Sequence, residues 1–210
     1  MKGLIFDLDG TLLDSMPAWQ EQLDLLFIRH GMTPPPDLLD RTKTLGLETA
    51  TALLLEEFGI DEVPADVYQG FQAAMNEAYC NTIPLKPGVL EFLQEMSGKV
   101  PMAVATATSH QLVEQVFARH NLGQYFHSVT TVADVGVGKH EPTVFLAAAK
   151  KMGLEAKDCV VFEDSLEAVR SANRAGFFTV AIAEATNKNE QAALQAEADK
   201  YIQDFCNFTL

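Results

Sequence analysis

The stretch GLIFDLDGT, residues 3–11, decides the fold. Its apolar run from Leu4 to Phe6 is typical of a strand that is buried on both faces of a sheet. Because side chains alternate along a strand, Asp7 and Asp9 at the end of this run point to the same side. Two carboxylates so close repel each other, and a divalent cation such as Mg²⁺ would relieve that repulsion. Taken alone, Asp-x-Asp-Gly is also common as a plain turn after a strand.

The composition indicates a globular protein without a nucleic-acid or membrane partner. The chain has 210 residues, of which 48% are hydrophobic, so one domain or one domain with a small insert is expected. A net charge of −14 argues against binding nucleic acid or an anionic membrane through bulk electrostatics. Neither a signal peptide nor an apolar run of membrane-spanning length is recognisable, and three widely spaced cysteines fit neither a disulfide framework nor a zinc site. We therefore expect a cytoplasmic protein with reduced thiols.

From Pro87 onward, apolar runs with strand character alternate with helical segments. Besides the first strand, strands are expected over residues 100–106, 128–132, 159–162 and 178–182. Such alternation predicts an α/β fold, in which helices cover both faces of a parallel sheet and the crossovers are right-handed. The expected core is a Rossmann-like sheet of about five strands.

Residues 16–82 interrupt this alternation with helical segments only. Pro17 and Gly31 fit the two ends of the first helix, and apolar residues at helical spacing continue through three further segments up to Cys80. An all-helical stretch inside an alternating chain predicts an inserted domain. We therefore expect a four-helix cap domain over 16–82 and an α/β core domain formed by 1–15 and 83–210.

Further polar residues follow the other expected strands at their carboxyl ends, where ligands bind in parallel sheets. Thr106 ends one strand, with the backbone N–H of Ala107 beside it, and Glu163 and Asp164 end another. Thr106 could hydrogen-bond a phosphoryl oxygen or serve as a turn hydroxyl, and its position fits both roles equally. Lys139 stands in a loop with little other charge, and a lysine is a compact charge suited to holding phosphate.

Four segments in this order resemble the motifs of the haloacid dehalogenase-like (HAD) phosphotransferase superfamily. They are DLDGT at 7–11, Thr106, GKHEP at 138–142 and FEDS at 162–165. The resemblance extends from residue 3 to about residue 182 and is closest to subfamily I, in which an insert at this place is a C1 helical cap. In one detail the chain departs from the pattern, because the family often has Pro directly after the lysine, where this chain has His140.

The resemblance implies a catalytic role for Asp7 and Asp9. Asp7 would be the nucleophile that forms an aspartyl phosphate, and Asp9 would be the general acid and base, with its backbone carbonyl on the metal. Asp7 and Asp164 would bind Mg²⁺ directly, while Glu163 would act through water or hold Lys139. The phosphate would be bound by the three remaining candidates, Thr106, Ala107 and Lys139.

The expected activity is Mg²⁺-dependent hydrolysis of a small phosphorylated metabolite, such as a sugar phosphate, by a monomer or weak dimer. Two alternatives remain open, a mutase of the β-phosphoglucomutase type and a non-catalytic binding domain of the same fold. The mutase pattern has an Arg three residues after the Gly at position 46 and a Lys two residues after the Tyr at position 79. This chain has Thr49 and Asn81 there, so a second phosphate would lack its partners unless Lys43 replaced them.

Overall fold

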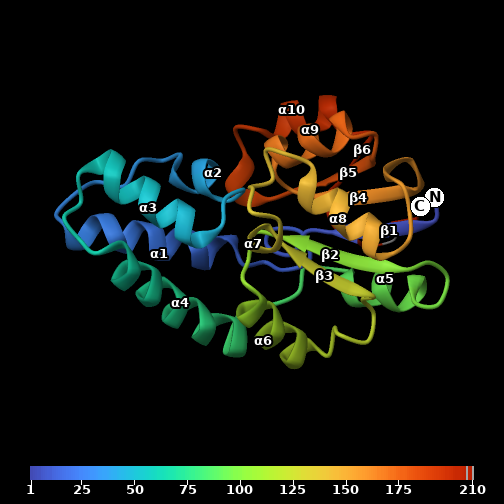
Figure 1. Ribbon diagram of the computed structural model, residues 1–210, viewed down its shortest axis with the longest axis horizontal. Coiled ribbons are helices and arrows are strands. Elements are labelled where there is room, and N and C mark those ends of the chain that lie inside the picture. Colours follow the sequence, from blue (N-terminus) through green and yellow to red (C-terminus); the bar gives the residue numbers. More distant parts are fainter. Residues whose placement is uncertain (207, 210) are drawn as a thin grey trace.

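The computed structural model describes residues 1–206, 208 and 209, which form an α/β structure around a parallel sheet (Figure 1). The strand order is β3-β2-β1-β4-β5-β6, and every neighbouring pair is parallel. The strands are β1 (Gly3–Phe6), β2 (Met102–Thr106), β3 (Ser128–Thr131), β4 (Cys159–Glu163), β5 (Phe178–Ile182) and β6 (Lys200–Ile202). The predicted α/β class is confirmed, and β1 lies at the centre of the sheet, between β2 and β4.

The predicted count of about five strands is wrong by one, because β6 extends the sheet beyond β5. β6 has three residues, Lys-Tyr-Ile, none of which is fully buried. It lies at the edge of the sheet, where only one neighbour is needed, with Lys200 opposite Val180 and Ile202 opposite Ile182. So short and exposed a strand leaves no apolar run in the sequence by which it could be recognised.

Helices cover both faces of the sheet, as predicted (Figure 1). Leu4 and Phe6 of β1 pack with α5 (Val89–Met96) and α6 (His110–His120) on one face. Ile5 points the other way, toward α8 (Thr143–Lys151) and α9 (Leu166–Arg174). Shorter elements complete this part of the chain, namely α7 (Val132–Val135), η1 (Ala156–Asp158), η2 (Ala185–Asn187) and α10 (Gln191–Glu197).

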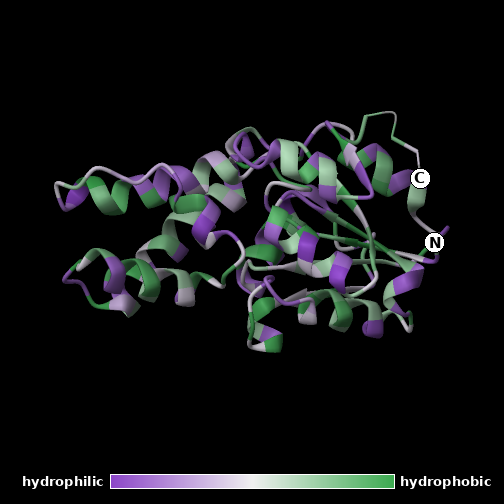
Figure 2. Cartoon of the chain, turned by 90° about the horizontal axis from the view of Figure 1, so that it is seen from above, coloured by the Kyte–Doolittle hydropathy of each residue, from purple (hydrophilic) through white to green (hydrophobic). Residues whose placement is uncertain are grey.

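Residues 16–81 hold four helices, which we call the helical block: α1 (Met16–Arg29), α2 (Leu38–Thr42), α3 (Leu47–Phe58) and α4 (Pro64–Asn81). The block projects beyond the carboxyl ends of the strands (Figures 1 and 2). It has a hydrophobic cluster of its own, in which Phe27, Leu54 and Phe71 are buried, and α4 also packs against α6 of the core. The division into a cap domain and a core domain stays a prediction.

No helix in the described part of the chain combines the length and the hydrophobicity that are needed to cross a membrane. The predicted cytoplasmic location and the monomeric or weakly dimeric state stay predictions.

Candidate active site

The residues predicted from the sequence gather at the carboxyl ends of three adjacent strands. Asp7 directly follows β1, Thr106 ends β2 and Glu163 ends β4. The Asp7 backbone N–H donates to the carbonyl of Phe162 at 2.9 Å, which fixes this acid beside the end of β4. A cavity of about 460 Å³ opens here between the sheet and the helical block, and its lining includes every predicted site residue: Asp7, Asp9, Thr106, Ala107, Lys139, Glu163 and Asp164.

Three buried carboxylates form the floor of the cavity. One oxygen each of Asp7, Glu163 and Asp164 lies within 4.8 Å of the others. Gly10 makes this proximity possible, because a Cβ there would lie 2.6 Å from Asp164 Oδ2 and its φ of +79° suits glycine. The Asp164 backbone N–H donates to Glu163 Oε1 at 3.1 Å, which fixes the orientation of the Glu163 carboxylate.

Burial makes ionisation of these acids costly. Loss of hydration and the charge of Glu163 raise the pKa of Asp7 well above its usual value, although Lys139 acts in the opposite direction. The same two causes raise the pKa of Asp164 to about 7. Three carboxylates against one lysine leave an excess of negative charge, and an all-oxygen donor set of this kind suits Mg²⁺. The residues present therefore fit the metal that the family resemblance implies.

Lys139 supplies positive charge to the cluster. It is 2% exposed, and its Nζ pairs with Asp7 and, at 2.9 Å, with Glu163 Oε2. Burial lowers the pKa of this lysine, but the carboxylates of Asp7 and Glu163 outweigh burial and raise it above its usual value. Lys139 is therefore a cation at neutral pH. Its contact with Glu163 agrees with one of the two roles predicted for that acid, which is to hold Lys139.

Asp9 lies apart from the acidic cluster, and its carboxylate is held by hydroxyl groups. Asp9 Oδ1 accepts hydrogen bonds from Ser15 Oγ at 2.6 Å and from the Tyr79 hydroxyl, while Oδ2 accepts one from Thr108. The indole N–H of Trp19 in turn donates to the Tyr79 oxygen at 3.2 Å. These hydroxyl donors hold the Asp9 carboxylate in one orientation. Its predicted role in proton transfer and the predicted contact of its carbonyl with a metal stay predictions.

Tyr79 and Thr108 are site residues that sequence reasoning missed. Tyr79 lies on α4, and burial together with the charge of Asp9 raises its pKa well above the usual value for tyrosine. A hydroxyl two residues beyond the end of a strand, as at Thr108, carries no signal in the sequence that it will reach Asp9. Thr106 accepts a hydrogen bond from the Thr108 backbone N–H at 3.1 Å, as a turn residue does, and still lines the cavity with its own donor.

The outer wall of the cavity comes largely from the helical block and carries few charges. Trp19, Leu23, Leu39 and Leu47 contribute apolar surface, and the amide of Gln72 contributes polar surface. Among the described residues that line the cavity, two are lysines, Lys139 on the floor and Lys43 on the wall.

Known proteins match this chain along most of its length. The sequence model of the haloacid dehalogenase-like hydrolase family matches residues 1–176. Hexitol phosphatase A of Escherichia coli is 32% identical, with 86% of this chain and 82% of that protein covered. Validoxylamine A 7′-phosphate phosphatase of Streptomyces hygroscopicus subsp. limoneus is 30% identical, with 97% and 93% covered.

Two solved structures share the fold of this chain. A putative β-phosphoglucomutase from Thermotoga maritima superimposes with a TM-score of 0.72 at 25% identity, covering 96% of this chain and 94% of that one. CbbY from Rhodobacter sphaeroides, in complex with phosphate, reaches a TM-score of 0.82 at 21% identity, covering 99% and 96%. The predicted class of enzyme, a phosphoric monoester hydrolase, is confirmed at the level of the family, because hexitol phosphatase A and validoxylamine A 7′-phosphate phosphatase are both named as phosphatases. The chain belongs to the haloacid dehalogenase-like hydrolase family.

Proposed function

We propose that this protein is a Mg²⁺-dependent phosphatase that hydrolyses the phosphate monoester of a small metabolite, namely a sugar or polyol phosphate. One observation carries the proposal: a cluster of three buried carboxylates, paired with Lys139, forms the floor of a cavity at the carboxyl end of the sheet. The name hexitol phosphatase A and that of a second relative, fructose-1-phosphate phosphatase YqaB of Escherichia coli, support a phosphorylated carbohydrate as substrate.

The metal would be held by the carboxylates of Asp7 and Asp164 and by the carbonyl of Asp9, with Glu163 in a supporting position. Bound there, Mg²⁺ would supply positive charge that reduces the repulsion between an anionic nucleophile and an anionic phosphate. Lys139 contributes to the same end, because its Nζ contacts both Asp7 and Glu163.

The reaction has two steps, and each uses both catalytic aspartates. In the first, an Asp7 oxygen attacks phosphorus while the leaving alcohol takes a proton from Asp9, which gives an aspartyl phosphate. In the second, Asp9 removes a proton from water as that water attacks phosphorus, and Asp7 leaves with its carboxylate restored. The Thr106 hydroxyl and the Ala107 N–H are donors for the phosphoryl oxygens, since both residues line the cavity floor.

Residues 16–82 would act as a cap domain on the core formed by 1–15 and 83–210. The helical block supplies most of the outer wall of the cavity, with apolar side chains such as Trp19 and Leu23. A cover of this kind excludes bulk water from the aspartyl phosphate until the alcohol has left. It also places the choice of substrate in the helical block, away from the acids that do the chemistry.

Asp164→Ala is expected to remove Mg²⁺-dependent activity while the fold is kept. Asp164 belongs to the buried acidic cluster, and without its carboxylate the metal loses a direct ligand. We expect phosphate release from p-nitrophenyl phosphate to fall to background at every Mg²⁺ concentration, with an unchanged circular dichroism spectrum. Full activity in this variant, or in wild-type protein with excess chelator, would contradict the assignment.

Hydrolysis is expected to prevail over phosphate transfer between positions of one sugar. A mutase has to bind a second phosphate, and the described wall of the cavity offers one lysine for it, Lys43, whose Nζ is already paired with Asp40 and Glu190. Phosphorus NMR of β-glucose 1-phosphate with catalytic glucose bisphosphate should therefore show free phosphate as the main product. Glucose 6-phosphate forming faster than free phosphate would establish the mutase instead.

A further inference from the structure

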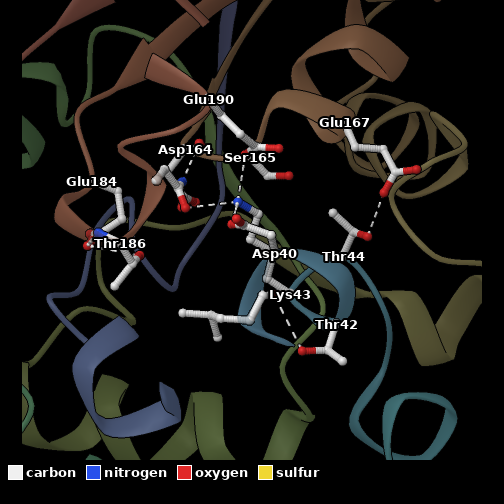
Figure 3. Close-up of polar contacts among 12 residues, drawn as sticks. Asp40, Thr42, Lys43, Thr44, Asp164, Ser165, Glu167, Glu184, Thr186 and Glu190 are labelled. Atoms are coloured by element: carbon white, nitrogen blue, oxygen red, sulfur yellow. Dashed lines mark hydrogen bonds and ion pairs between the residues drawn. The ribbon is translucent and has the colours of Figure 1, made fainter. Parts of the chain in front are cut away.

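Lys43 and Thr44, which lie between α2 and α3, reach from the helical block to the core (Figure 3). Lys43 contacts Asn187 and Glu190, which lie at η2 and at the start of α10, and Thr44 contacts Glu167 of α9. We call these five residues the clasp. Its core partners lie up to 147 positions away in the sequence, so the clasp is a tertiary feature that joins the two parts of the chain.

The ammonium group of Lys43 has no donor left for a substrate. Its side chain is 6% exposed, and Nζ donates to Glu190 Oε2 at 2.8 Å and to Asn187 Oδ1 and Asp40 Oδ1 at 2.9 Å each. A lysine has three such donors, and all three are used within the protein. Lys43 therefore acts on its protein neighbours, although its side chain borders the cavity.

Asn187 passes this contact on to the acidic cluster. It is buried, and its Nδ2 donates to the Asp164 carboxylate at 2.9 Å and to the Asp164 carbonyl at 2.8 Å. Because Lys43 occupies Oδ1, the amide has a single favourable orientation, with Nδ2 toward Asp164. The opposite orientation would place an NH₂ group against an ammonium and a carbonyl oxygen against a carboxylate.

Thr44 ties the same short segment to the loop that carries Lys139. The backbone N–H of Lys139 donates to the Thr44 carbonyl at 3.0 Å, and Thr44 Oγ1 donates to Glu167 at 2.9 Å. Glycine at position 138 allows this approach, because a Cβ there would lie 2.9 Å from the Thr44 oxygen. The segment thus contacts the core at Asn187, which binds Asp164, and at the backbone of Lys139.

We infer that Lys43 is a positioning residue, which acts through Asn187 to orient the Asp164 carboxylate toward the metal. Assembly of the metal site then depends on docking of the helical block, because the cation that fixes Asn187 comes from that block. The inference rests on the proposed function in so far as it requires a metal at Asp164. Partners that orient a ligand carboxylate typically change metal affinity by about 10- to 100-fold when they are removed.

Calorimetric titration with Mg²⁺, without substrate, tests the inference. Lys43→Met and Asn187→Ala are each expected to raise the Kd for Mg²⁺ by roughly tenfold or more. If Lys43 acts through Asn187, the double variant should bind no more weakly than Asn187→Ala alone, because two residues in one chain of contacts are not additive. Lys99→Met is the matched control, since this exposed lysine pairs with Glu95 at 3.2 Å, and it should keep the wild-type Kd.

Each outcome has a distinct meaning. An unchanged Kd for Mg²⁺ in Lys43→Met, with a raised KM for substrate, would overturn the inference and make Lys43 a substrate-binding residue. Additive losses in the double variant would also overturn it, because the two residues would then act separately. Absence of Mg²⁺ binding in the wild-type protein would contradict the proposed metal dependence itself. Should Lys43→Met not fold, Lys43→Gln removes the charge and keeps two N–H donors, and the same tenfold weakening is expected.

Discussion

Replacing Asp7 with asparagine is expected to lower kcat by roughly 10⁴- to 10⁶-fold, as removal of a nucleophile does in enzymes whose catalytic groups act as a unit. The amide has the shape of the carboxylate, but it cannot form the aspartyl phosphate. Wild-type protein quenched rapidly during turnover should carry one phosphate on Asp7, detectable by fragmentation mass spectrometry, and Asp7→Asn should carry none.

The stability of this variant separates a chemical role from a structural one. Burial and the charge of Glu163 raise the pKa of Asp7, so the ionised side chain is a cost to the folded state. A neutral amide removes that cost, while Lys139 keeps Glu163 as a partner at 2.9 Å. We therefore expect no loss in the free energy of unfolding, measured in urea. A phosphate found on Thr11 or Ser15 of the wild type, or substantial activity in Asp7→Asn, would refute the role of Asp7.

Lys139→Met is expected to damage the fold as well as the chemistry. Its removal leaves the buried Asp7 and Glu163 without their common cation. Removing one partner of a buried ion pair typically lowers the free energy of unfolding by about 3–5 kcal/mol. The free energy of unfolding in urea should fall by about this amount when Mg²⁺ is absent. Activity should be lost together with it, because the charge of the nucleophile is no longer balanced.

Added Mg²⁺ should recover part of the stability that Lys139→Met loses, because the metal neutralises the same carboxylates. Lys99→Met serves as the control, since it removes an equal charge from an exposed pair that is worth little. Equal stability losses in the two variants would show that Lys139 is not the cation that the acidic cluster requires.

The sequence was sufficient to predict the sheet and the acids at its edge. β1, β2 and β4 are apolar runs that end in polar residues, and parallel pairing brings those ends together whatever lies between them. Asp7, Thr106 and Asp164 could therefore be assigned to one site from their places at the carboxyl ends of expected strands. The edge strand β6 escaped prediction because its pairing with β5 depends on the backbone, which leaves its side chains free to be polar.

Residues that contact these acids from distant parts of the sequence could not be predicted. Tyr79 reaches Asp9 only because α4 packs along α1, and Asn187 of η2 reaches Asp164 from a segment that follows β5. Neither residue belongs to a local pattern, since its role depends on where separate helices come to lie. Lys43 was considered as a cation for substrate phosphate, whereas the structure pairs it with Asp40 and Glu190.

The clasp sets a condition on exchanging substrate preferences between related enzymes. One continuous stretch of the gene, codons 16–81, encodes the helical block and most of the cavity wall, so a transplant of this stretch looks simple. Yet Lys43 needs an acceptor at 187 and an acid at 190, and Thr44 needs a residue without a Cβ at 138. A chimera that receives the helical block in a core without these residues at 138, 187 and 190 would have the new cavity wall but a disordered metal site. Recombination should therefore succeed where the two halves match at three codons far downstream.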